Sequence, residues 1–255
     1  MLKDFSKDEF DIVIQAGQSN SEGTGFGDVE NPYVPNDKVW YLNNDFTISR
    51  AAELVAVNDI QSNYALSFSR EYVDRGLLKG NRKLLILRAG VGGTGFSDGP
   101  WNMSGDLYLR MMDMIRASLA LNPSNRLVAF LWHQGETDAI LGASFEMHYN
   151  HLINLLHSVR ETFSVPTLPF ITADFVHHWK NRNLAICTPV LDAIRAVCKE
   201  CNDCVFIETD GLLSNEQQNK RHPWGWDDNI HFSRKSLYDL GERYFAAFAC
   251  CIAAS

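Results

Sequence analysis

The sequence predicts an α/β protein built on a parallel sheet that carries helices on both faces. Six apolar runs rich in β-branched residues are spaced widely along the chain. Most of these runs are continuous rather than alternating, which is typical of strands that are buried on both sides. Segments with helical periodicity separate the runs, and strands that alternate with helices of this length favour a doubly wound parallel sheet.

The individual elements follow from these two patterns. In chain order, the predicted strands cover residues 10–16, 38–42, 84–89, 127–132, 168–173 and 204–208. The predicted helices cover residues 63–75, 105–121, 145–163, 189–199 and 233–250. Within the third helix, apolar side chains recur at three- and four-residue steps and form one stripe, made of Tyr149, Leu152, Leu156, Val159 and Phe163.

Length and charge limit the classes of function. The chain has 255 residues, no internal repeat and no long linker, so we expect a single domain over residues 1–255. Its 23 lysines and arginines against 31 aspartates and glutamates give a formal net charge of −8, which argues against binding to nucleic acid. No apolar run approaches the roughly 20 residues that span a bilayer, so we expect no membrane insertion. The sequence indicates no oligomeric state.

The N-terminal segment and the cysteines bear on the compartment. Residues 1–10 are charged throughout and lack the apolar region of a signal peptide, which predicts a cytoplasmic protein, or a secreted one if a leader has been removed. All six cysteines follow residue 186, a distribution that suits a reducing compartment. Cys198, Cys201 and Cys204 have the spacing of a metal knuckle. A closed zinc site needs four ligands and no fourth is apparent, so we expect structural thiols and no metal.

Polar clusters follow the predicted strands. In a doubly wound sheet, ligands bind beyond the carboxyl ends of the strands, so these clusters are the places to look for a site. They comprise Gly17-Gln-Ser-Asn20, Arg88–Phe96, Trp132–Asp138, Asp174–Trp179 and, before the last helix, Arg221–Ser233.

The first cluster contains a candidate nucleophile. An apolar strand stops at Gly17, and Ser19 follows on what we expect to be a tight turn. A strand that ends in glycine and then presents a hydroxyl is a common way to expose a nucleophile. The alternative interpretation is a strand–helix junction in which Ser19 or Asn20 caps the helix, because Ser and Asn are favoured at that position.

The last cluster contains a candidate base. An Asp three residues before His231 could hold one imidazole nitrogen within a local loop and leave the other free to accept a proton from a hydroxyl. Asp228 has this spacing, and Asp227 is a rival partner that only geometry can separate from it. The alternative is that His231 lies on the surface at the start of the last helix.

The glycine-rich cluster is a candidate ligand loop. Gly90, Gly92 and Gly95 have the spacing of a dinucleotide-binding motif, but no helix begins directly after them and no P-loop Lys-Ser/Thr follows. Glycines here would let the backbone approach a ligand closely and aim an N–H at it. The remaining histidines of the clusters and helices, His148, His151, His177 and His178, are predicted to be solvated or capping residues.

Taken together, four blocks resemble the SGNH hydrolase superfamily, in particular its carbohydrate-esterase branch of sialate O-acetylesterases and acetylxylan esterases. The blocks are Gly17-Gln-Ser-Asn20, Gly92-Gly-Thr94, Trp132-His-Gln-Gly-Glu136 and Asp228-x-x-His231, in the order of the family. The chain has Gly-Gln-Ser where the lipase members have Gly-Asp-Ser, and Gln134 where they have Asn. Both differences are typical of the carbohydrate-esterase branch. An α/β-hydrolase fits less well, since Ser21 stands where its nucleophile motif needs glycine.

The resemblance implies a fold, an activity and a set of roles. The fold would be a three-layer α/β/α sandwich with a flavodoxin-like parallel sheet. The activity would be that of a serine esterase that removes O-acetyl groups from an acetylated saccharide through an acyl-enzyme, without a cofactor. Ser19 would be the nucleophile, His231 the base and Asp228 the orienting acid. The oxyanion would be held by the N–H of Ser19, the side-chain amide of Gln134 and the N–H of Gly93, with Gly92 as the alternative.

Further residues are expected to support these roles. We assign a supporting role to Gln18, Asn20, Gly92 and Glu136. Trp224 and Trp226, with Trp101 as a further candidate, flank the blocks and could stack on a sugar ring, although buried packing is an equal alternative. Two other functions remain open: a catalytically silent carbohydrate-binding relative, and a lipase or thioesterase on the same fold.

Overall fold

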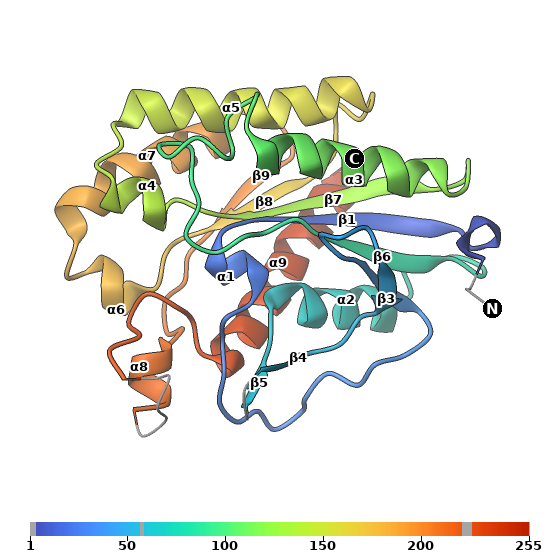
Figure 1. The fold of residues 1–255 in the computed structure, drawn as a ribbon, viewed down its shortest axis with the longest axis horizontal. Coiled ribbons are helices and arrows are strands. Elements are labelled where there is room, and N and C mark those ends of the chain that lie inside the picture. Colours follow the sequence, from blue (N-terminus) through green and yellow to red (C-terminus); the bar gives the residue numbers. More distant parts are fainter. Residues whose placement is uncertain (1–3, 57–58, 221–225, 255) are drawn as a thin grey trace.

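A seven-stranded sheet forms the centre of the molecule (Figure 1). The computed structural model describes residues 4–56, 59–220 and 226–254. The strands lie in the order β3-β2-β6-β1-β7-β8-β9, and all neighbouring pairs are parallel except β2 and β3. Their bounds are β1 (Phe10–Gly17), β2 (Val39–Leu42), β3 (Ile48–Arg50), β6 (Lys83–Arg88), β7 (Arg126–His133), β8 (Phe170–Ala173) and β9 (Cys204–Ile207). A separate antiparallel pair contains β4 (Leu54–Ala56) and β5 (Asp59–Gln61).

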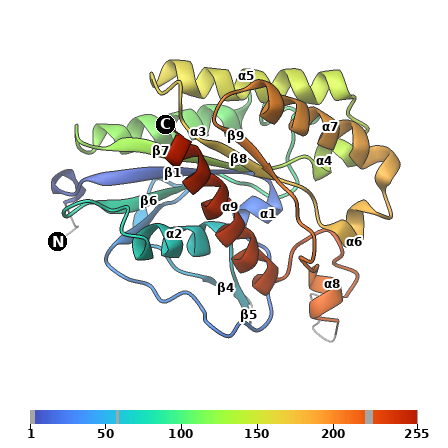
Figure 2. The same ribbon diagram turned by 180° about the vertical axis from the view of Figure 1, so that it is seen from behind.

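Helices cover both faces of this sheet (Figures 1 and 2). One face carries α3 (Asp106–Ala120), α5 (Phe145–Thr162) and α7 (Leu184–Glu200), and the other carries α2 (Tyr64–Asp74) and α9 (Arg234–Ala254). Four short helices lie at the carboxyl ends of the strands or in the connections that follow them: α1 (Ser19–Glu22), α4 (Glu136–Ile140), α6 (His177–Lys180) and α8 (Asn215–Gln218). A 3₁₀ turn covers Phe5–Lys7. The predicted α/β fold with helices on both faces of a parallel sheet is confirmed, apart from the antiparallel strand β3.

Strand β1 is the central strand of the sheet and is buried on both faces. Ile12 and Ile14 pack into the core beneath α3, α5 and α7, whereas Val13 points into the core beneath α2 and α9. All three side chains are fully buried, and each contributes roughly 1.5–3 kcal/mol relative to an exposed side chain. This burial fixes the register of β1 against β6 and β7, and therefore fixes where its carboxyl end lies.

The structure differs from the predicted elements in two respects. The short strands β3, β4 and β5 were not predicted, because their side chains are mostly half-buried or exposed and carry no continuous apolar signal. Helix α7 begins at Leu184 rather than at Pro189, which lies inside it. A proline there removes only one intrahelical hydrogen bond, and the buried apolar face of α7 continues on both sides of it.

None of the helices in the described ranges is both long enough and apolar enough to cross a bilayer.

Candidate active site

The chain turns sharply where β1 ends. Gly17 has a φ angle of +128°, and a Cβ atom on it would lie 2.0 Å from the carbonyl oxygen of His133 on β7. The N–H of Gln18 donates to the same carbonyl oxygen at 2.9 Å. Only glycine allows this approach, which ends the strand and starts α1 at Ser19. We refer to residues 17–22 as the serine turn.

Ser19 lies in a line of three polar side chains. Its Oγ is 2.8 Å from Nε2 of His231, and Nδ1 of His231 is 2.8 Å from Oδ1 of Asp228. The carboxylate that contacts His231 therefore belongs to Asp228 and not to its rival Asp227. Ser19 and His231 are 212 positions apart in the chain, and the fold brings them together at the carboxyl edge of the sheet.

Asp228 is held in place by several donors. Nδ2 of Asn215 donates to its Oδ2 at 2.8 Å, and the N–H of His231 donates to its Oδ1 at 3.3 Å. Asn215 is the first residue of α8, whose N-cap Ser214 forms a capping box with Gln217. Sequence reasoning missed Asn215, although the Ser-x-x-Gln capping pattern indicated that a helix begins there.

Asn20 connects the serine turn to the loop that carries His231. Its Nδ2 donates to Oε1 of Glu136 at 2.8 Å and to the carbonyl oxygen of Ile230 at 3.1 Å. Its Oδ1 accepts the N–H of Phe232 at 3.0 Å. Because Ile230 and Phe232 flank His231, these bonds fix the distance between the imidazole and the hydroxyl of Ser19.

Glu136 is a buried acid behind the serine turn. Both Glu136 and His133 are fully buried, and Nε2 of His133 lies 3.4 Å from Oε1 of Glu136. Burial raises the pKa of Glu136, but the nearby imidazole of His133 and the hydrogen bond of Asn20 outweigh burial and lower it. Glu136 therefore stays ionised and can accept the Asn20 amide at neutral pH.

The backbone N–H groups of Ser19 itself and of Gly93 are available to a ligand. A Cβ placed on Gly92 would lie 3.5 Å from Cβ of Ser19, so the glycine loop borders the serine. The N–H of Gly92 donates to Oε2 of Glu22 at 2.8 Å. Within the described part of the chain, the N–H groups of Gly93 and Ser19 donate to no protein acceptor. Of the two candidate glycines, Gly93 has the free donor.

Gln134 comes from the end of β7 and is 1% exposed. Its Nε2 donates to Oδ2 of Asp138 at 2.8 Å, while its Oε1 has no partner among the described residues. Asp138 also accepts the N–H groups of Phe96 and Ser97, at 3.2 and 2.6 Å. Asp138 thus links Gln134 to the segment that follows the glycine loop, and sequence reasoning missed it.

The sequence predicts that His148 is a solvated or capping residue, but the structure places it in the interior. It is fully buried, and its Nδ1 is 3.2 Å from Oδ2 of Asp138. Burial raises the pKa of Asp138, but the nearby imidazole of His148 and the hydrogen bonding of Ser97 outweigh burial and hold that pKa well below its usual range. The helical spacing of His148 gave no sign of this partner, because Asp138 lies on another element.

This depressed pKa predicts how stability depends on pH. A carboxyl group whose pKa is lower in the folded state stabilises the fold above its unfolded pKa of about 3.9, and that contribution is lost as the pH falls towards the folded value. We expect Asp138→Asn to lower the melting temperature at pH 7 and to flatten its decline below about pH 4. Calorimetric melting between pH 7 and pH 2 measures both effects. Asp113→Asn, at an exposed carboxyl paired with Arg116, serves as the control. Equal pH profiles for the wild type and Asp138→Asn would contradict this assignment.

Gln18 braces the start of α4. Its Oε1 accepts the N–H groups of Gly135 and Thr137 at 3.2 and 3.1 Å. These donors belong to the first turn of α4 and its N-cap, where backbone N–H groups have no helical partner. The serine turn and the segment that carries Gln134 are therefore held together.

The tryptophans differ in their surroundings. Trp226 is 76% exposed and close in sequence to Asp228. Trp101 is 1% exposed and packs edge-on against Trp132 with ring centroids 5.0 Å apart, so it is not available to stack on a ligand. Trp224 lies outside the described residues.

The cysteines are free, and the sulfur atoms of Cys198, Cys201 and Cys204 do not all lie within 4.8 Å of one another. Sγ of Cys201 is 3.8 Å from Nε2 of His157. In the described ranges, the one group of three potential metal ligands close together is Asp174, His177 and Glu208. Lys180 already forms an ion pair with Asp174 there.

Comparisons with known proteins identify the family of the chain. A family model described as "Carbohydrate esterase, sialic acid-specific acetylesterase" matches residues 9–250. A probable 9-O-acetyl-N-acetylneuraminic acid deacetylase of Escherichia coli is 28% identical over 87 residues, which are 31% of this chain and 27% of the relative. A probable carbohydrate esterase of Arabidopsis thaliana is 26% identical over 179 residues, which are 63% of this chain and 66% of that relative.

Solved structures share the fold. The crystal structure of NanS superposes with a TM-score of 0.82 at 17% identity, covering 97% of this chain and 99% of that one. The Arabidopsis thaliana esterase structure has a TM-score of 0.71 at 21% identity, with coverage of 94% and 98%. The resemblance indicated by the four sequence blocks is therefore confirmed. The chain belongs to the carbohydrate esterase family of sialic acid-specific acetylesterases.

Proposed function

We propose that this protein is a serine esterase that hydrolyses O-acetyl groups on carbohydrates. The observation that carries the proposal is the line from Asp228 through His231 to Ser19, with both contacts at 2.8 Å. This is the arrangement in which an acid orients an imidazole and the imidazole activates a hydroxyl. Membership of the esterase family supports the same reaction.

Acylation starts when Oγ of Ser19 attacks the acetyl carbonyl carbon. Nε2 of His231 takes the hydroxyl proton and then gives it to the departing sugar oxygen. Asp228 accepts the Nδ1–H of His231, which holds the neutral ring in the tautomer that has a free Nε2 and stabilises the imidazolium. Water then attacks the acetyl-enzyme with His231 again as base, releasing acetate and restoring the serine.

The negative charge on the carbonyl oxygen needs fixed donors. The N–H groups of Ser19 and Gly93 have no protein acceptor in the described part of the chain, and Nε2 of Gln134 completes the set. Asp138 holds the Gln134 amide, and Glu136 and Asn20 hold the serine turn against the His231 loop. Donors fixed before reaction cost no reorganisation when charge develops.

For the substrate, we propose acetyl esters of sialic acids. The Escherichia coli relative is named as a probable deacetylase of 9-O-acetyl-N-acetylneuraminic acid, and the matching family is described as sialic acid-specific. Acetate release from a panel of acetylated sialic acids, acetylated xylans and long-chain acyl esters tests the assignment. Turnover confined to long-chain esters would instead indicate a lipase or thioesterase. Saccharide binding without any acetate release would indicate a silent relative.

Replacing Gln134 by alanine is expected to lower kcat about 10²–10³-fold, because one oxyanion donor is typically worth that much. The KM for the acetyl ester should change little, since the donor acts on charge that appears only in the transition state. Steady-state kinetics of acetate release measure both quantities. Gln61→Ala, on the short strand β5, is a control for the loss of a glutamine elsewhere. A Gln134→Ala enzyme with wild-type kcat would remove Gln134 from the oxyanion site.

A further inference from the structure

A polar hollow adjoins the serine turn. It has a volume of about 340 Å³ and lies at the carboxyl ends of β1, β2 and β6. Its walls come from the serine turn, from the β2–β3 connection and from the strand ends, and they include Gln15, Glu22, Asn44, Asp45 and Arg88. Nothing in the mechanism above uses this hollow.

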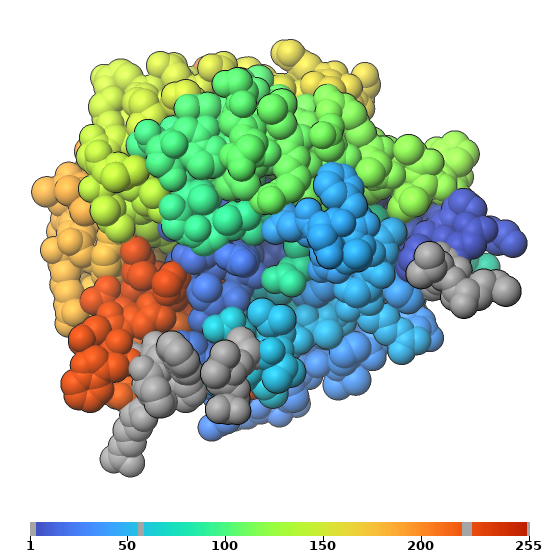
Figure 3. Space-filling view, in the orientation of Figure 1, coloured from blue at the N-terminus to red at the C-terminus, as the bar shows by residue number. Residues whose placement is uncertain are grey.

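The hollow is close to the reacting hydroxyl. Glu22 and Gly90 line it, and Glu22 belongs to α1, which begins at Ser19. Oε2 of Glu22 bonds to the N–H of Gly92, the residue that borders Ser19. In Figure 3, the dark blue atoms around the serine turn lie between the orange atoms around α8 and the brighter blue atoms of the β2–β3 connection. The hollow therefore borders the turn that carries Ser19.

Arg88 brings a positive charge with unused donors to the hollow. One guanidinium nitrogen donates to the carbonyl oxygen of Glu22 at 3.0 Å, and the guanidinium carbon lies 5.0 Å from the centre of the Tyr41 ring. These contacts fix its position. The Nε of Arg88 is buried and has no hydrogen-bond partner among the described residues, and no described carboxylate forms an ion pair with this side chain.

The carboxylates of the hollow already have donors. Glu22 accepts the N–H of Gly92, and Oδ1 of Asp45 accepts both the N–H and the hydroxyl of Thr47, at 3.0 and 2.6 Å. By contrast, the side-chain oxygen of Gln15, a residue 1% exposed, has no partner in the described part of the chain. A buried polar atom without a partner costs free energy, which a ligand hydroxyl would recover.

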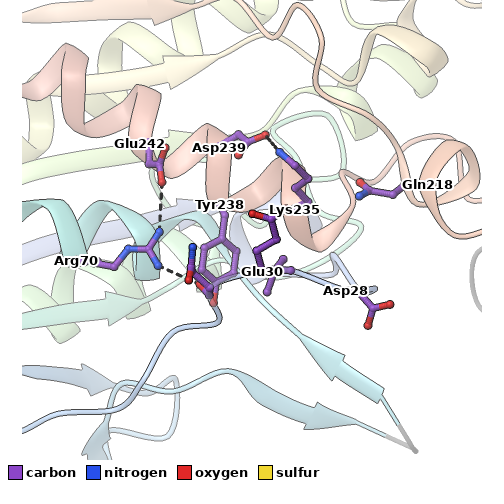
Figure 4. A pocket seen from close by; sticks show the side chains of 10 residues that line it. Asp28, Glu30, Arg70, Gln218, Lys235, Tyr238, Asp239 and Glu242 are labelled. Atoms are coloured by element: carbon purple, nitrogen blue, oxygen red, sulfur yellow. Dashed lines mark hydrogen bonds and ion pairs between the residues drawn. The ribbon is translucent and has the colours of Figure 1, made fainter.

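A second hollow on the molecule shows the contrast (Figure 4). Two of its cations are Arg70 and Lys235, and each is paired with a carboxylate: Arg70 with Glu242 at 3.2 Å and Lys235 with Asp239 at 2.7 Å. Those charges are neutralised within the protein. The guanidinium of Arg88 has no such partner in the described residues, so its charge is available to a ligand.

We propose that the hollow is the subsite for the body of an acidic acetylated sugar, in which Arg88 binds the substrate carboxylate and Gln15 accepts a sugar hydroxyl. The inference rests on the proposed esterase activity and deepens it, because it names the residues that select an anionic substrate. A guanidinium fixed in advance loses little side-chain entropy when it binds a carboxylate.

The wild-type enzyme tests this with two substrates that differ only in charge. They are 9-O-acetyl-N-acetylneuraminic acid and its carboxyl methyl ester, and acetate release is measured for both. We expect kcat/KM to be about tenfold or more higher for the acid, mainly through KM, and this preference to shrink at high salt. Equal kcat/KM values for the two substrates would overturn the subsite and leave the esterase assignment intact. Absence of acetate release from every acetylated saccharide would overturn the esterase assignment itself.

Variants then assign the preference to a residue. Arg88→Met should bring the acid-to-methyl-ester ratio of kcat/KM close to one, and Arg88→Lys should retain part of it. Arg50→Met, at an exposed arginine of β3 paired with Asp37, should leave the ratio unchanged. A full wild-type ratio in a folded Arg88→Met enzyme would overturn the role of Arg88. If Arg88→Met does not fold, the Arg88→Lys ratio and the wild-type salt dependence decide the question.

Discussion

Replacing Ser19 by alanine is expected to lower the rate of acetate release by about 10⁴-fold or more. The slow reaction that remains would be due to the oxyanion donors and to substrate binding. The fold should be unaffected, because the hydroxyl contacts only His231 among the described residues and its loss leaves a small void. Steady-state kinetics of acetate release measure the change, and thermal unfolding checks the fold.

Two controls make this result specific to the hydroxyl of Ser19. Ser124→Ala removes an exposed hydroxyl next to the amino end of β7. This end of the strands is opposite to the carboxyl ends where Ser19 lies, so the variant should keep the wild-type rate. A fluorophosphonate should add covalently to Ser19 in the wild type and not in Ser19→Ala, as mass spectrometry of the digested protein would show. Undiminished acetate release by Ser19→Ala would refute the proposed mechanism.

Replacing His231 by alanine is expected to lower kcat by a comparable factor, because Ser19 then has no base. The double variant Ser19→Ala/His231→Ala should be no slower than either single variant, since residues that act as one unit are not additive. His157→Ala removes an exposed imidazole on α5 and provides the control. A double variant that is slower by the product of the two single effects would show that Ser19 and His231 act independently.

Much of the fold could be predicted because its signals are local. The six long strands of the sheet are continuous apolar runs, and five helices carry an apolar stripe, so each was predicted within a few residues except the start of α7. The short helices and the three-residue strands β3, β4 and β5 carry no such pattern. Helix α4, for example, starts at Glu136 because Gln18 accepts its free N–H groups, and that partner lies more than a hundred residues away.

The site could be predicted only in part, for the same physical reason. Ser19, Asp228 and His231 stand in blocks with recognisable spacing. Asn215 holds Asp228, and Asp138 holds Gln134 while it accepts the N–H groups of Phe96 and Ser97, 42 and 41 positions earlier in the chain. A single aspartate or asparagine near a helix start looks like an ordinary cap, so nothing local distinguishes such residues. Whether the predicted residues catalyse the reaction is what the variants above test.

The separation of Ser19 and His231 along the chain has a consequence for biosynthesis. The serine turn leaves the ribosome before its partner His231, which lies 212 positions later, and the sheet that places the turn also needs β6 and β7, which follow it in the chain. Contacts of such high sequence separation form late in folding, because the intervening chain must first be ordered. A nascent chain shorter than residue 231 therefore lacks the complete site. Onset of esterase turnover during synthesis would report that folding has reached the last helix.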